Sequence, residues 1–349
     1  MCHEVLQPWP SDRLEELGIC PVCGCRNNII LESDLIDLMS KPATGPWTIK
    51  SCLDCGVAYL SPRPDIDSIN DAYGHYYTHT SDKDDLVHSV FRSIKNCIAD
   101  KYYAVASGSG RFLDNVVYLI IKVIFPLSLY FDAKSRHIFS VNKQPGKLLD
   151  IGCGNGEFLR FANRFSWDVV GIDFDEKAVA EAKSSGFDVR HGGIDIIGSE
   201  ERFDFISLSH VIEHVYDPVD LIHSCFTLLN DGGVLWLETP NIESMGYVYY
   251  RSNWRGLEPP RHVILFNQTS LYKIIESSGF HSIEQKNHGL SGLYMGLASE
   301  RLLNTFKPSE SKVEYFSRKL IKLLRVVSLE LVQLSYKRRR EFLTLIAIR

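Results

Sequence analysis

From Gly146 onward, short runs of apolar residues alternate with segments in which apolar residues recur every three or four positions. The short runs predict buried strands and the periodic segments predict helices, an alternation typical of βαβ units around a parallel sheet. The predicted fold class is α/β. Seven strands are expected, at the sequences KLLDIG, DVVGID, DVRHGG, FDFISLS, GGVLWLET, HSIEQKN and EFLTLIAIR.

The chain as a whole divides into three parts. Residues 1–75 are short pieces punctuated by Cys, Pro and Asn, which predict small strands and turns. Residues 76–145 predict a helical linker or cap, and 146–349 form the α/β domain. Within that domain, 291–340 predicts an inserted pair of amphipathic helices, because a structureless loop of that length is uncommon.

Composition narrows the class of protein. The chain has 349 residues, 45% of them hydrophobic and 23% charged, as in ordinary globular proteins that bury a full core. A formal net charge of -5 argues against a protein that coats nucleic acid. The first ten residues lack the basic start and apolar core of a signal peptide, so we expect a cytoplasmic protein. The apolar run Val116–Phe131 is shorter than a membrane-spanning helix and is interrupted by Lys122 and Pro126.

The stretch LLDIGCGNGEF places a glycine-rich turn between the first strand and the first helix of the α/β domain. Glycines allow positive φ and close approach of a ligand to the backbone, and the start of a helix offers free N–H groups. A dinucleotide-binding turn has the pattern G-x-G-x-x-G. Here the third glycine comes one residue early and Glu157 follows it, so the turn is better suited to a ligand without phosphates.

This turn resembles the first motif of class I S-adenosylmethionine-dependent methyltransferases, and an acid follows 23 residues after Asp150, at the end of the next strand. The resemblance implies a Rossmann-like fold with S-adenosylmethionine as cofactor. It also implies that Asp173 binds the ribose hydroxyls, that Phe174 lies against the adenine, and that Ile194 lies at the adenine edge. The residues that the resemblance assigns to the cofactor are Asp150, Gly152, Gly154, Gly156, Asp173, Phe174, Ile194, Ser209 and His210.

The segment SLSHVIEHVYDP after the fourth strand resembles a signature of the ubiquinone-type O-methyltransferases. We expect His210 to begin a helix and His214 to lie one turn further on the same face, beside Glu213. A histidine titrating near neutrality can accept the proton of an acceptor hydroxyl, so His214 and Glu213 are catalytic candidates. The alternative is that His214 only holds the helix against the sheet. The ubiquinone-type enzymes have a glutamate where this chain has His210, which argues against a metal site of their kind.

Four cysteines form two matched pairs, CPVCG and CLDCG. Two such knuckles supply the four thiolates of a closed, tetrahedral zinc site, which is a structural rather than a catalytic arrangement. The predicted ligands are Cys20, Cys23, Cys52 and Cys55, whereas Cys25 is an additional thiol that is not expected to bind the metal. The alternative is a set of reduced cysteines without a metal.

The segment after the fifth strand, from Leu237 to Asn267, is rich in Tyr, Pro and Arg. It resembles methyltransferases that combine the pattern W-x-G-L-x-x-P-R-H with a four-cysteine zinc domain, many of which act in sugar, polysaccharide or lipid-linked glycan pathways. The resemblance implies that Trp254, Arg261 and His262 line the acceptor pocket, and His262 is a second candidate for the base. The alternative is that Arg261 and His262 brace this segment onto the domain.

We therefore expect an S-adenosylmethionine-dependent methyltransferase whose acceptor is a sugar hydroxyl of a small molecule or glycan. A sugar C-methyltransferase, a lipid or quinone-type O-methyltransferase and a zinc-ribbon RNA methyltransferase remain alternatives, although residues 1–75 lack the basic stripe of an RNA-binding surface. The segments 116–131 and 316–340 are apolar, and the second has Lys and Arg between its apolar residues. They either pack together as a cap or dimer contact, or lie against the inner face of a membrane.

Overall fold

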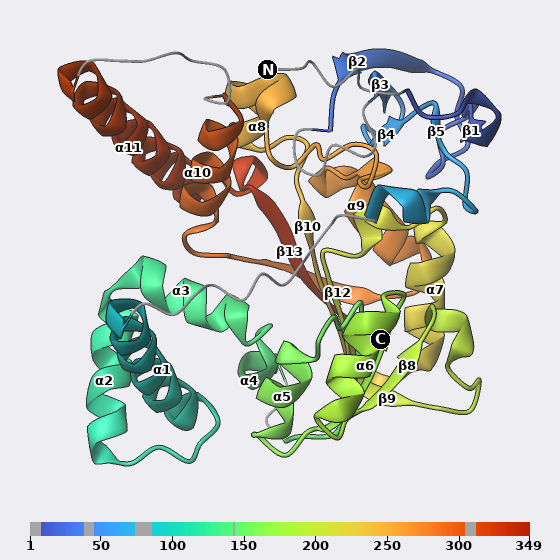
Figure 1. Cartoon of the computed structure of the whole chain (residues 1–349). Coiled ribbons are helices and arrows are strands. Elements are labelled where there is room, and N and C mark those ends of the chain that lie inside the picture. Colours follow the sequence, from blue (N-terminus) through green and yellow to red (C-terminus); the bar gives the residue numbers. More distant parts are fainter. Residues whose placement is uncertain (1–7, 38–44, 74–85, 142–143, 304–311) are drawn as a thin grey trace.

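The computed structural model describes residues 8–37, 45–73, 86–141, 144–303 and 312–349 (Figure 1). Its centre is a seven-stranded sheet in the order β12-β13-β10-β9-β6-β7-β8. β13 runs antiparallel to both of its neighbours and the remaining pairs are parallel. This arrangement confirms the predicted α/β class and the Rossmann-like sheet. The strands are β6 Lys147–Ile151, β7 Asp168–Asp173, β8 Asp188–His191, β9 Phe203–Ser209, β10 Leu229–Pro240, β12 His281–Lys286 and β13 Phe342–Ile348.

Helices pack on both faces of this sheet because successive side chains of its strands point to opposite sides. On β6, Leu148 packs in the cluster that contains residues of α5 and α6, whereas Leu149 packs in the cluster that contains residues of α7 and α9. Asp175 and Asp217 start α6 and α7 by accepting hydrogen bonds from N–H groups of their first turns. These helices are α4 Ile138–Val141, α5 Glu157–Asn163, α6 Glu176–Ser184, α7 Pro218–Leu228 and α9 Gln268–Ser277.

A second, four-stranded antiparallel sheet has the order β11-β4-β3-β2. Three of its strands come from the N-terminal region, but β11 is Ile264–Leu265, which follows the central strand β10. The predicted boundary near residue 75 therefore does not separate two independent units. The other elements here are β1 Leu14–Glu15, β2 Asn28–Leu35, β3 Trp47–Cys52, β4 Ala58–Leu60, β5 Arg63–Pro64 and the 3-10 helices Ser11–Arg13 and Ile69–Tyr73.

The remaining helices form two groups at the edge of the molecule (Figure 1). In the first group, Tyr102, Tyr103, Ile121 and Phe131 form a small core that contacts Phe161 of α5. The second group occupies the interval 291–340 as two helices that lie side by side. The first group is α1 Leu86–Ala106, α2 Phe112–Val123 and α3 Phe125–Lys134; the second is α10 Ser291–Leu303 and α11 Lys312–Ser335, and the short helix α8 Met245–Tyr250 contacts this second pair.

Among the described residues, no single helix is both long enough and apolar enough to cross a membrane. Only α2 together with Leu127–Lys134 reaches that length and hydropathy, and the axes of these two pieces are bent by 112°.

Candidate functional site

The glycine-rich turn lies between β6 and α5, at the carboxyl edge of the central sheet. Gly152, Gly154 and Gly156 all have positive φ, at 70°, 52° and 78°. A Cβ on Gly152 would come within 2.5 Å of a methyl group of Val211, so the turn is also closed by packing from the segment after β9. A residue with a side chain would strain this backbone, which explains the choice of glycine.

Two acids flank this turn, as the sequence predicts. Asp173, at the end of β7, accepts hydrogen bonds from Gly154 N at 2.7 Å and Asp175 N at 2.8 Å, which fixes its carboxylate beside the turn. Asp150 is fully buried at the end of β6, and Ser207 donates to its Oδ1 at 2.8 Å. Its Oδ2 is buried without a hydrogen-bond partner among the described residues. Buried carboxylate oxygens are usually satisfied, so Asp150 Oδ2 suits a ligand that donates a hydrogen bond.

Arg136 is a residue of this site that the sequence analysis missed. Its guanidinium forms an ion pair with Asp150, donates to Ser207 Oγ at 2.7 Å and lies 3.9 Å from the centre of the Phe158 ring. Burial raises the pKa of Asp150, and the Arg136 charge opposes that rise. Arg136 and His137 both have positive φ, at 48° and 56°, and this turn aims Arg136 at the sheet edge. No motif marks it in the sequence.

Phe174 and Ile194 lie beside one another past the ends of β7 and β8. The Phe174 side chain is 74% exposed, and a Cβ on Gly193 would come within 2.9 Å of its ring. Ile194 begins the 3-10 helix Ile194–Ile196 and is half-buried. An exposed aromatic ring next to an aliphatic side chain at the carboxyl edge is suited to a flat, apolar group such as a purine.

The segment after β9 differs from the prediction. Residues Ile212–His214 form a short 3-10 helix, and α7 begins only at Pro218, so His210 and His214 do not share a helix face. Pro218 and the cap Asp217 explain the later start, because proline is favoured in the first turn and cannot donate a backbone hydrogen bond. His210 has a positive φ of 54°, outside the right-handed helical region.

His210 lies between the buried carboxylates of Glu213 and Glu238. His288, which the sequence analysis missed, contacts the second of them. The Nδ1 of His210 is 3.2 Å from Glu213 Oε1 and its Nε2 is 3.6 Å from Glu238 Oε1. His288 Nδ1 lies 2.8 Å from Glu238 Oε2, which also accepts from Thr344. Although burial opposes the charged form, the carboxylates raise the pKa of His210 above its ordinary value. Ser209, half-buried, precedes this cluster at the end of β9.

Glu213 is a buried carboxylate that orients its neighbours. Its two oxygens contact His210 and Thr239, the latter at 2.9 Å. Burial opposes its ionisation, but His210 and the other nearby histidines outweigh this effect and lower the pKa of Glu213 to about 2. It therefore stays ionised near neutral pH and cannot serve there as a proton donor.

The structure brings the two predicted bases together. The rings of His214 and His262 are 4.8 Å apart, in an edge-to-face arrangement. His214 Nδ1 lies 2.9 Å from the carbonyl oxygen of Arg261, and His262 Nδ1 lies 2.7 Å from that of Gly256. A carbonyl oxygen can only accept, so each Nδ1 carries the hydrogen and each Nε2 keeps a free lone pair. Tyr73, which the sequence analysis did not single out, places its hydroxyl 3.1 Å from His214 Nδ1.

These two histidines differ in exposure. His214 is half-buried, whereas His262 is buried, and burial lowers the pKa of His262 to about 4. Ligand atoms of Glu213, His214 and His262 all lie within 4.8 Å of one another, which is also close enough to share a metal ion. In its neutral form each ring presents Nε2 as the nitrogen suited to accepting a proton or a Lewis acid.

Trp254 and Arg261 are not on a surface that faces a ligand. Trp254 is 1% exposed, and its indole N–H donates to Glu341 at 3.0 Å. Arg261 is fully buried and holds Asp37 with two hydrogen bonds, of 2.8 and 2.9 Å, while also donating to Glu258. Both side chains are occupied within the protein, so this arrangement favours the bracing alternative over direct contact with an acceptor.

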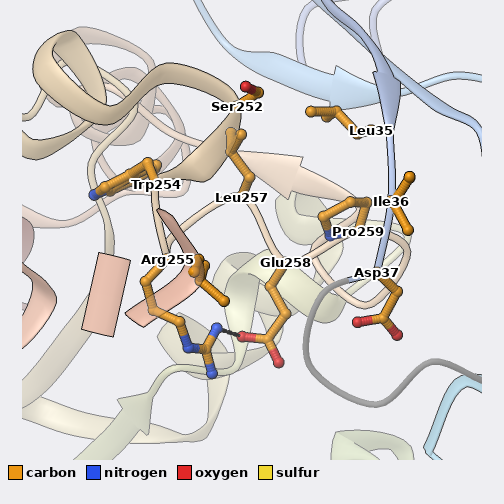
Figure 2. Close-up of a pocket in the computed structure, with 10 residues that line it drawn as sticks. Leu35, Ile36, Asp37, Ser252, Trp254, Arg255, Leu257, Glu258 and Pro259 are labelled. Carbon is orange, nitrogen blue, oxygen red and sulfur yellow. Dashed lines mark hydrogen bonds and ion pairs between the residues drawn. The ribbon is translucent and has the colours of Figure 1, made fainter. Parts of the chain in front are cut away.

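A small cavity lies beside Asp37 and Glu258, the partners of Arg261, between the end of β2 and the segment 252–259 (Figure 2). Leu35, Ile36 and Asp37 line it from the N-terminal region, and residues between 252 and 259 line the opposite side. Its volume is about 20 Å³, which has room for about one water molecule. An acceptor must therefore bind elsewhere, and the half-buried His214 is the accessible member of the histidine pair.

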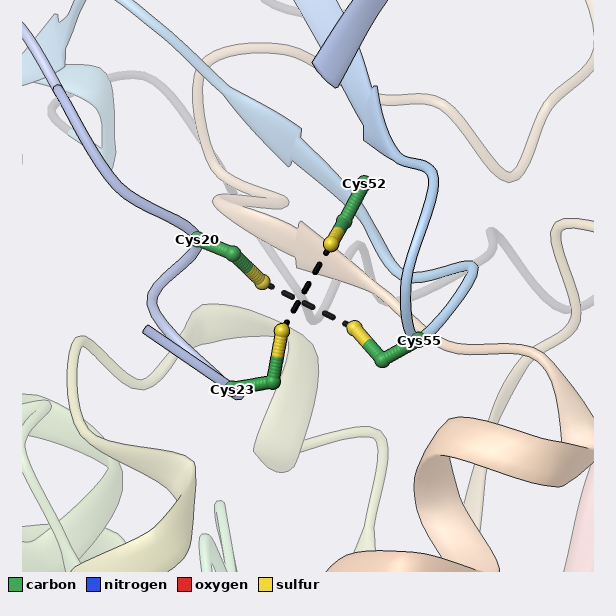
Figure 3. A group of neighbouring side chains, drawn as sticks. All are labelled: Cys20, Cys23, Cys52 and Cys55. Carbon is green, nitrogen blue, oxygen red and sulfur yellow. Dashed lines mark hydrogen bonds between the residues drawn. The ribbon is translucent and has the colours of Figure 1, made fainter. Parts of the chain in front are cut away.

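The four predicted zinc ligands converge on one point (Figure 3). Cys20 and Cys55 have their sulfur atoms 3.7 Å apart, and those of Cys23 and Cys52 are 3.5 Å apart. In each knuckle the glycine after the second cysteine donates to the first cysteine's carbonyl, Gly24 to Cys20 and Gly56 to Cys52, both at 2.9 Å. These turns require the positive φ of Gly24 and Gly56. The sulfur arrangement fits a tetrahedral metal site with no open position.

Comparison with known proteins identifies the central domain. Residues 128–285 match a family model described as a methyltransferase domain. A ubiquinone biosynthesis O-methyltransferase from Roseobacter denitrificans is 29% identical over 153 residues, which are 40% of this chain and 62% of that protein. One from Pseudomonas fluorescens is 32% identical over 117 residues, 31% of this chain and 50% of that protein.

The chain thus matches between about half and three fifths of the length of these curated relatives. Among solved structures, a SAM-dependent methyltransferase from Archaeoglobus fulgidus aligns with a TM-score of 0.42 at 20% identity, over 62% of this chain and 92% of that one.

The buried histidines predict a loss of stability in mild acid. Burial lowers the pKa of His137 and of His262 to about 4, whereas histidine in an unfolded chain titrates near 6.5. Between these values the unfolded chain binds protons that the folded chain does not, so the free energy of unfolding is complete above about pH 6.5 and falls until about pH 4. Each histidine contributes about 3 kcal/mol to this fall.

Urea unfolding at pH 7.5, 6.5, 5.5 and 4.5 measures it. Two buried carboxyls oppose part of this fall: burial raises the pKa of Glu341 to about 7 and also raises that of Asp150, so protonation of these groups in the folded chain adds stability as the pH falls below about 7. The raised pKa of His210 acts in the opposite direction only above pH 6.5, and the lowered pKa values of Glu213 and Glu238 act only below about pH 5. His137→Gln should reduce the slope between pH 6.5 and 5, whereas His223→Gln, at an exposed position on α7, should leave it unchanged. Equal slopes in the three proteins would show that His137 is not buried in its neutral form.

Proposed function

We propose that this protein transfers the methyl group of S-adenosylmethionine to a hydroxyl of a sugar-containing acceptor. The observation that carries the proposal is the Asp173 carboxylate, fixed beside the glycine turn, with the unpartnered Asp150 Oδ2 next to it. When bound, S-adenosylmethionine supplies an activated methyl on a sulfonium. Asp173 is placed to accept hydrogen bonds from the ribose hydroxyls, and Asp150 to accept from the ammonium of the methionine part.

Arg136 completes the proposed cofactor site. Its charge lies next to Asp150, at the buried end of the proposed cofactor site, where it is suited to the methionine carboxylate. Phe174 and Ile194 offer the apolar surface for the adenine at the other end. Gly152, Gly154 and Gly156 keep the floor between the two ends free of side chains. The cofactor would thus be held along the carboxyl edge of β6, β7 and β8, where α/β sheets bind ligands.

The acceptor's proton is assigned to His214. Its Nδ1 donates to the Arg261 carbonyl, which in the neutral ring leaves the lone pair on Nε2, and it is more accessible than His262. His262 packs edge-to-face against it and, with Tyr73, fixes the orientation of its ring. A base oriented in this way can accept a hydroxyl proton as the oxygen attacks the methyl carbon.

The sugar-containing acceptor follows from the resemblance of residues 254–266 to sugar and glycan methyltransferases. The curated relatives are O-methyltransferases of ubiquinone biosynthesis, which favours transfer to oxygen and makes a quinone-type phenol the second candidate acceptor. A sugar C-methyltransferase is a further alternative that would use the same base at a carbon atom.

A structural zinc ion bound by Cys20, Cys23, Cys52 and Cys55 is the second part of the proposal. Four thiolates leave no coordination position for a substrate, so the ion would stabilise the N-terminal sheet and take no part in transfer.

Methyl-labelled S-adenosylmethionine, incubated with the protein and either nucleotide sugars, a glycolipid extract or a demethylated quinone precursor, tests the acceptor. Mass spectrometry should find the label on a sugar oxygen. Solvent deuterium at a sugar carbon would favour C-methylation, and label on the quinone precursor alone would overturn the sugar assignment.

The same assay measures the effect of removing the proposed base. His214→Ala should lower kcat by about 10²- to 10⁴-fold, the usual contribution of a general base. His262→Ala should cost less, about tenfold, because it loses only the orientation of His214. The affinity for S-adenosylhomocysteine should be unchanged in both variants. The control is His223→Ala, at an exposed position of α7. Full turnover in His214→Ala would show that another group accepts the proton.

A further inference from the structure

Helix α11 presents an apolar face to solvent along its described length. Six large aliphatic side chains lie on this face, and each is between 41 and 61% exposed. They recur at the spacing of one helix face, which contains no charged residue between 320 and 335, only Ser328 and Ser335 as further exposed members. These side chains, the α11 face, are Leu320, Ile321, Leu323, Leu324, Val327 and Leu331.

The opposite side of α11 packs against the protein, and it carries buried polar residues beside the buried Val326 and Leu329. Glu330 is buried and accepts hydrogen bonds from the backbone N–H groups of Leu290 and Leu293, at 2.9 and 3.0 Å. Gln333 is buried too, and its Oε1 accepts from Ser291 Oγ at 3.0 Å. Rotating α11 to bury its leucines would leave these buried groups without hydrogen-bond partners, which is unfavourable.

Close packing also fixes this orientation. A Cβ on Gly292 of α10 would come within 2.7 Å of Gln333 Nε2, and one on Gly296 within 3.1 Å of a Val326 methyl group. The two glycines therefore let α11 approach α10 through Val326 and Gln333. The apolar face of α11 is directed outward by the packing of the other face.

Helix α2 repeats this pattern in the other helical group. Its exposed face carries six large apolar residues, each between 41 and 84% exposed. Ile121, on the opposite side, is buried in the core that α1, α2 and α3 share. Both helices lie on the same side of the molecule as viewed in Figure 1. The exposed residues, the α2 face, are Phe112, Leu113, Val116, Leu119, Ile120 and Val123.

The charges next to the α11 face are mainly positive. Directly after α11, Lys337, Arg338 and Arg339 form an exposed basic turn. From 320 to 339 the single acidic residue, Glu330, is buried. Because the whole chain carries a formal charge of -5, this basic segment is a local feature that complements an anionic surface.

We propose that the α11 face and the α2 face bind the surface of an anionic lipid bilayer, with the helices lying in the plane of the interface. An apolar face bordered by cations, on a helix too short or too polar to span the bilayer, is the arrangement of interfacial helices. The basic turn Lys337–Arg339 would contact lipid phosphates while the aliphatic side chains enter the acyl boundary. This binding does not depend on the identity of the methyl acceptor.

Flotation of the full chain with vesicles tests the proposal. We expect binding to vesicles of phosphatidylcholine with about one quarter phosphatidylglycerol, weaker binding to pure phosphatidylcholine, and partial release by salt, since surface charges are screened. The double variant Leu324→Glu/Leu331→Glu and the double variant Leu119→Glu/Val123→Glu should each lower the partition coefficient at least about tenfold. Each loses two apolar side chains that would be buried in the bilayer. Lys337→Gln/Arg339→Gln should weaken only the binding to anionic vesicles.

The matched control is Ile30→Glu/Ile66→Glu, which adds the same charges at two exposed isoleucines of the N-terminal region, and it should bind like the wild type. Unchanged S-adenosylhomocysteine affinity and thermal unfolding would show that each variant is folded. Three results would overturn the proposal. The first is no binding of the wild type to anionic vesicles, and the second is binding of both glutamate double variants equal to that of the wild type. The third is resistance of the bound protein to alkaline carbonate extraction, which marks insertion into the bilayer. A wild-type dimer in light scattering that Leu324→Glu/Leu331→Glu dissociates would instead assign the α11 face to a second copy of the chain.

Discussion

Replacing Asp173 by Ala is expected to weaken binding of S-adenosylhomocysteine by about 10²- to 10³-fold. The carboxylate is positioned by Gly154 N and Asp175 N, and it would accept two hydrogen bonds from a ribose diol. Hydrogen bonds to a charged group contribute about 1.5–3 kcal/mol each, so the loss of two corresponds to at least a hundredfold in affinity. Isothermal titration calorimetry of the full chain measures it directly.

Asp168→Ala is the control for this substitution, because Asp168 is an exposed acid at the opposite end of the same strand β7. It removes the same charge without touching the carboxyl edge, and the affinity should stay within about twofold of the wild type, as expected for a surface position. Equal affinity in Asp173→Ala and the wild type would contradict the cofactor site and with it the proposed transfer of a methyl group. A comparable loss in both variants would point to charge or folding as the cause.

The central sheet and the placement of the acids and glycines around its first turn were predictable because their signals are local. Most strands of the central sheet are short apolar runs, and Asp150, the glycines and Asp173 occupy fixed positions relative to the ends of β6 and β7. The four cysteines belong to the same category, since two residues separate the members of each pair. Patterns of this kind report on the fold because backbone geometry alone decides where such residues lie.

The parts that the sequence did not reveal depend on long-range contacts. Arg261 braces Asp37 across 224 positions of sequence, and β11 joins β4 of the N-terminal sheet. Neither contact leaves a periodic pattern, so Arg261 looked like a residue free to bind an acceptor. Arg136 was missed for the same reason, because its partner Asp150 is reached through an irregular turn rather than from a helix or strand.

These contacts make the N-terminal sheet a support for the proposed acceptor site. His262 lies between Arg261, which holds Asp37, and β11, which pairs with β4. Tyr73, at the end of the same region, contacts His214. The histidine pair is therefore positioned by the N-terminal sheet, whereas the described contacts of Asp150, Asp173 and the glycine turn come from the central sheet, Arg136 and Val211. The two halves of the site should respond separately to damage of the N-terminal region.

Removing zinc should therefore abolish methyl transfer while leaving S-adenosylhomocysteine binding largely intact. We expect one zinc ion per chain by elemental mass spectrometry, and none in Cys52→Ser. Structural zinc contributes on the order of 10–16 kcal/mol to folding of small units, so its loss should unfold the β2–β4 sheet and release β11, Tyr73 and Asp37. His214 and His262 would then lose their fixed orientation, which predicts a loss of kcat of at least about a hundredfold.

Cys25→Ser separates this explanation from a general effect of thiol removal. Cys25 is half-buried beside the first knuckle, and its sulfur contacts only the Cys23 carbonyl, at 3.9 Å, among the hydrogen bonds of the described residues. We expect this variant to keep its zinc and its activity. If Cys52→Ser lost S-adenosylhomocysteine affinity to the same degree as turnover, the two sheets would form one cooperative unit; if Cys25→Ser lost zinc, Cys25 would belong to the ligand set. Zinc-free wild-type protein with full turnover would contradict the supporting role of the zinc site.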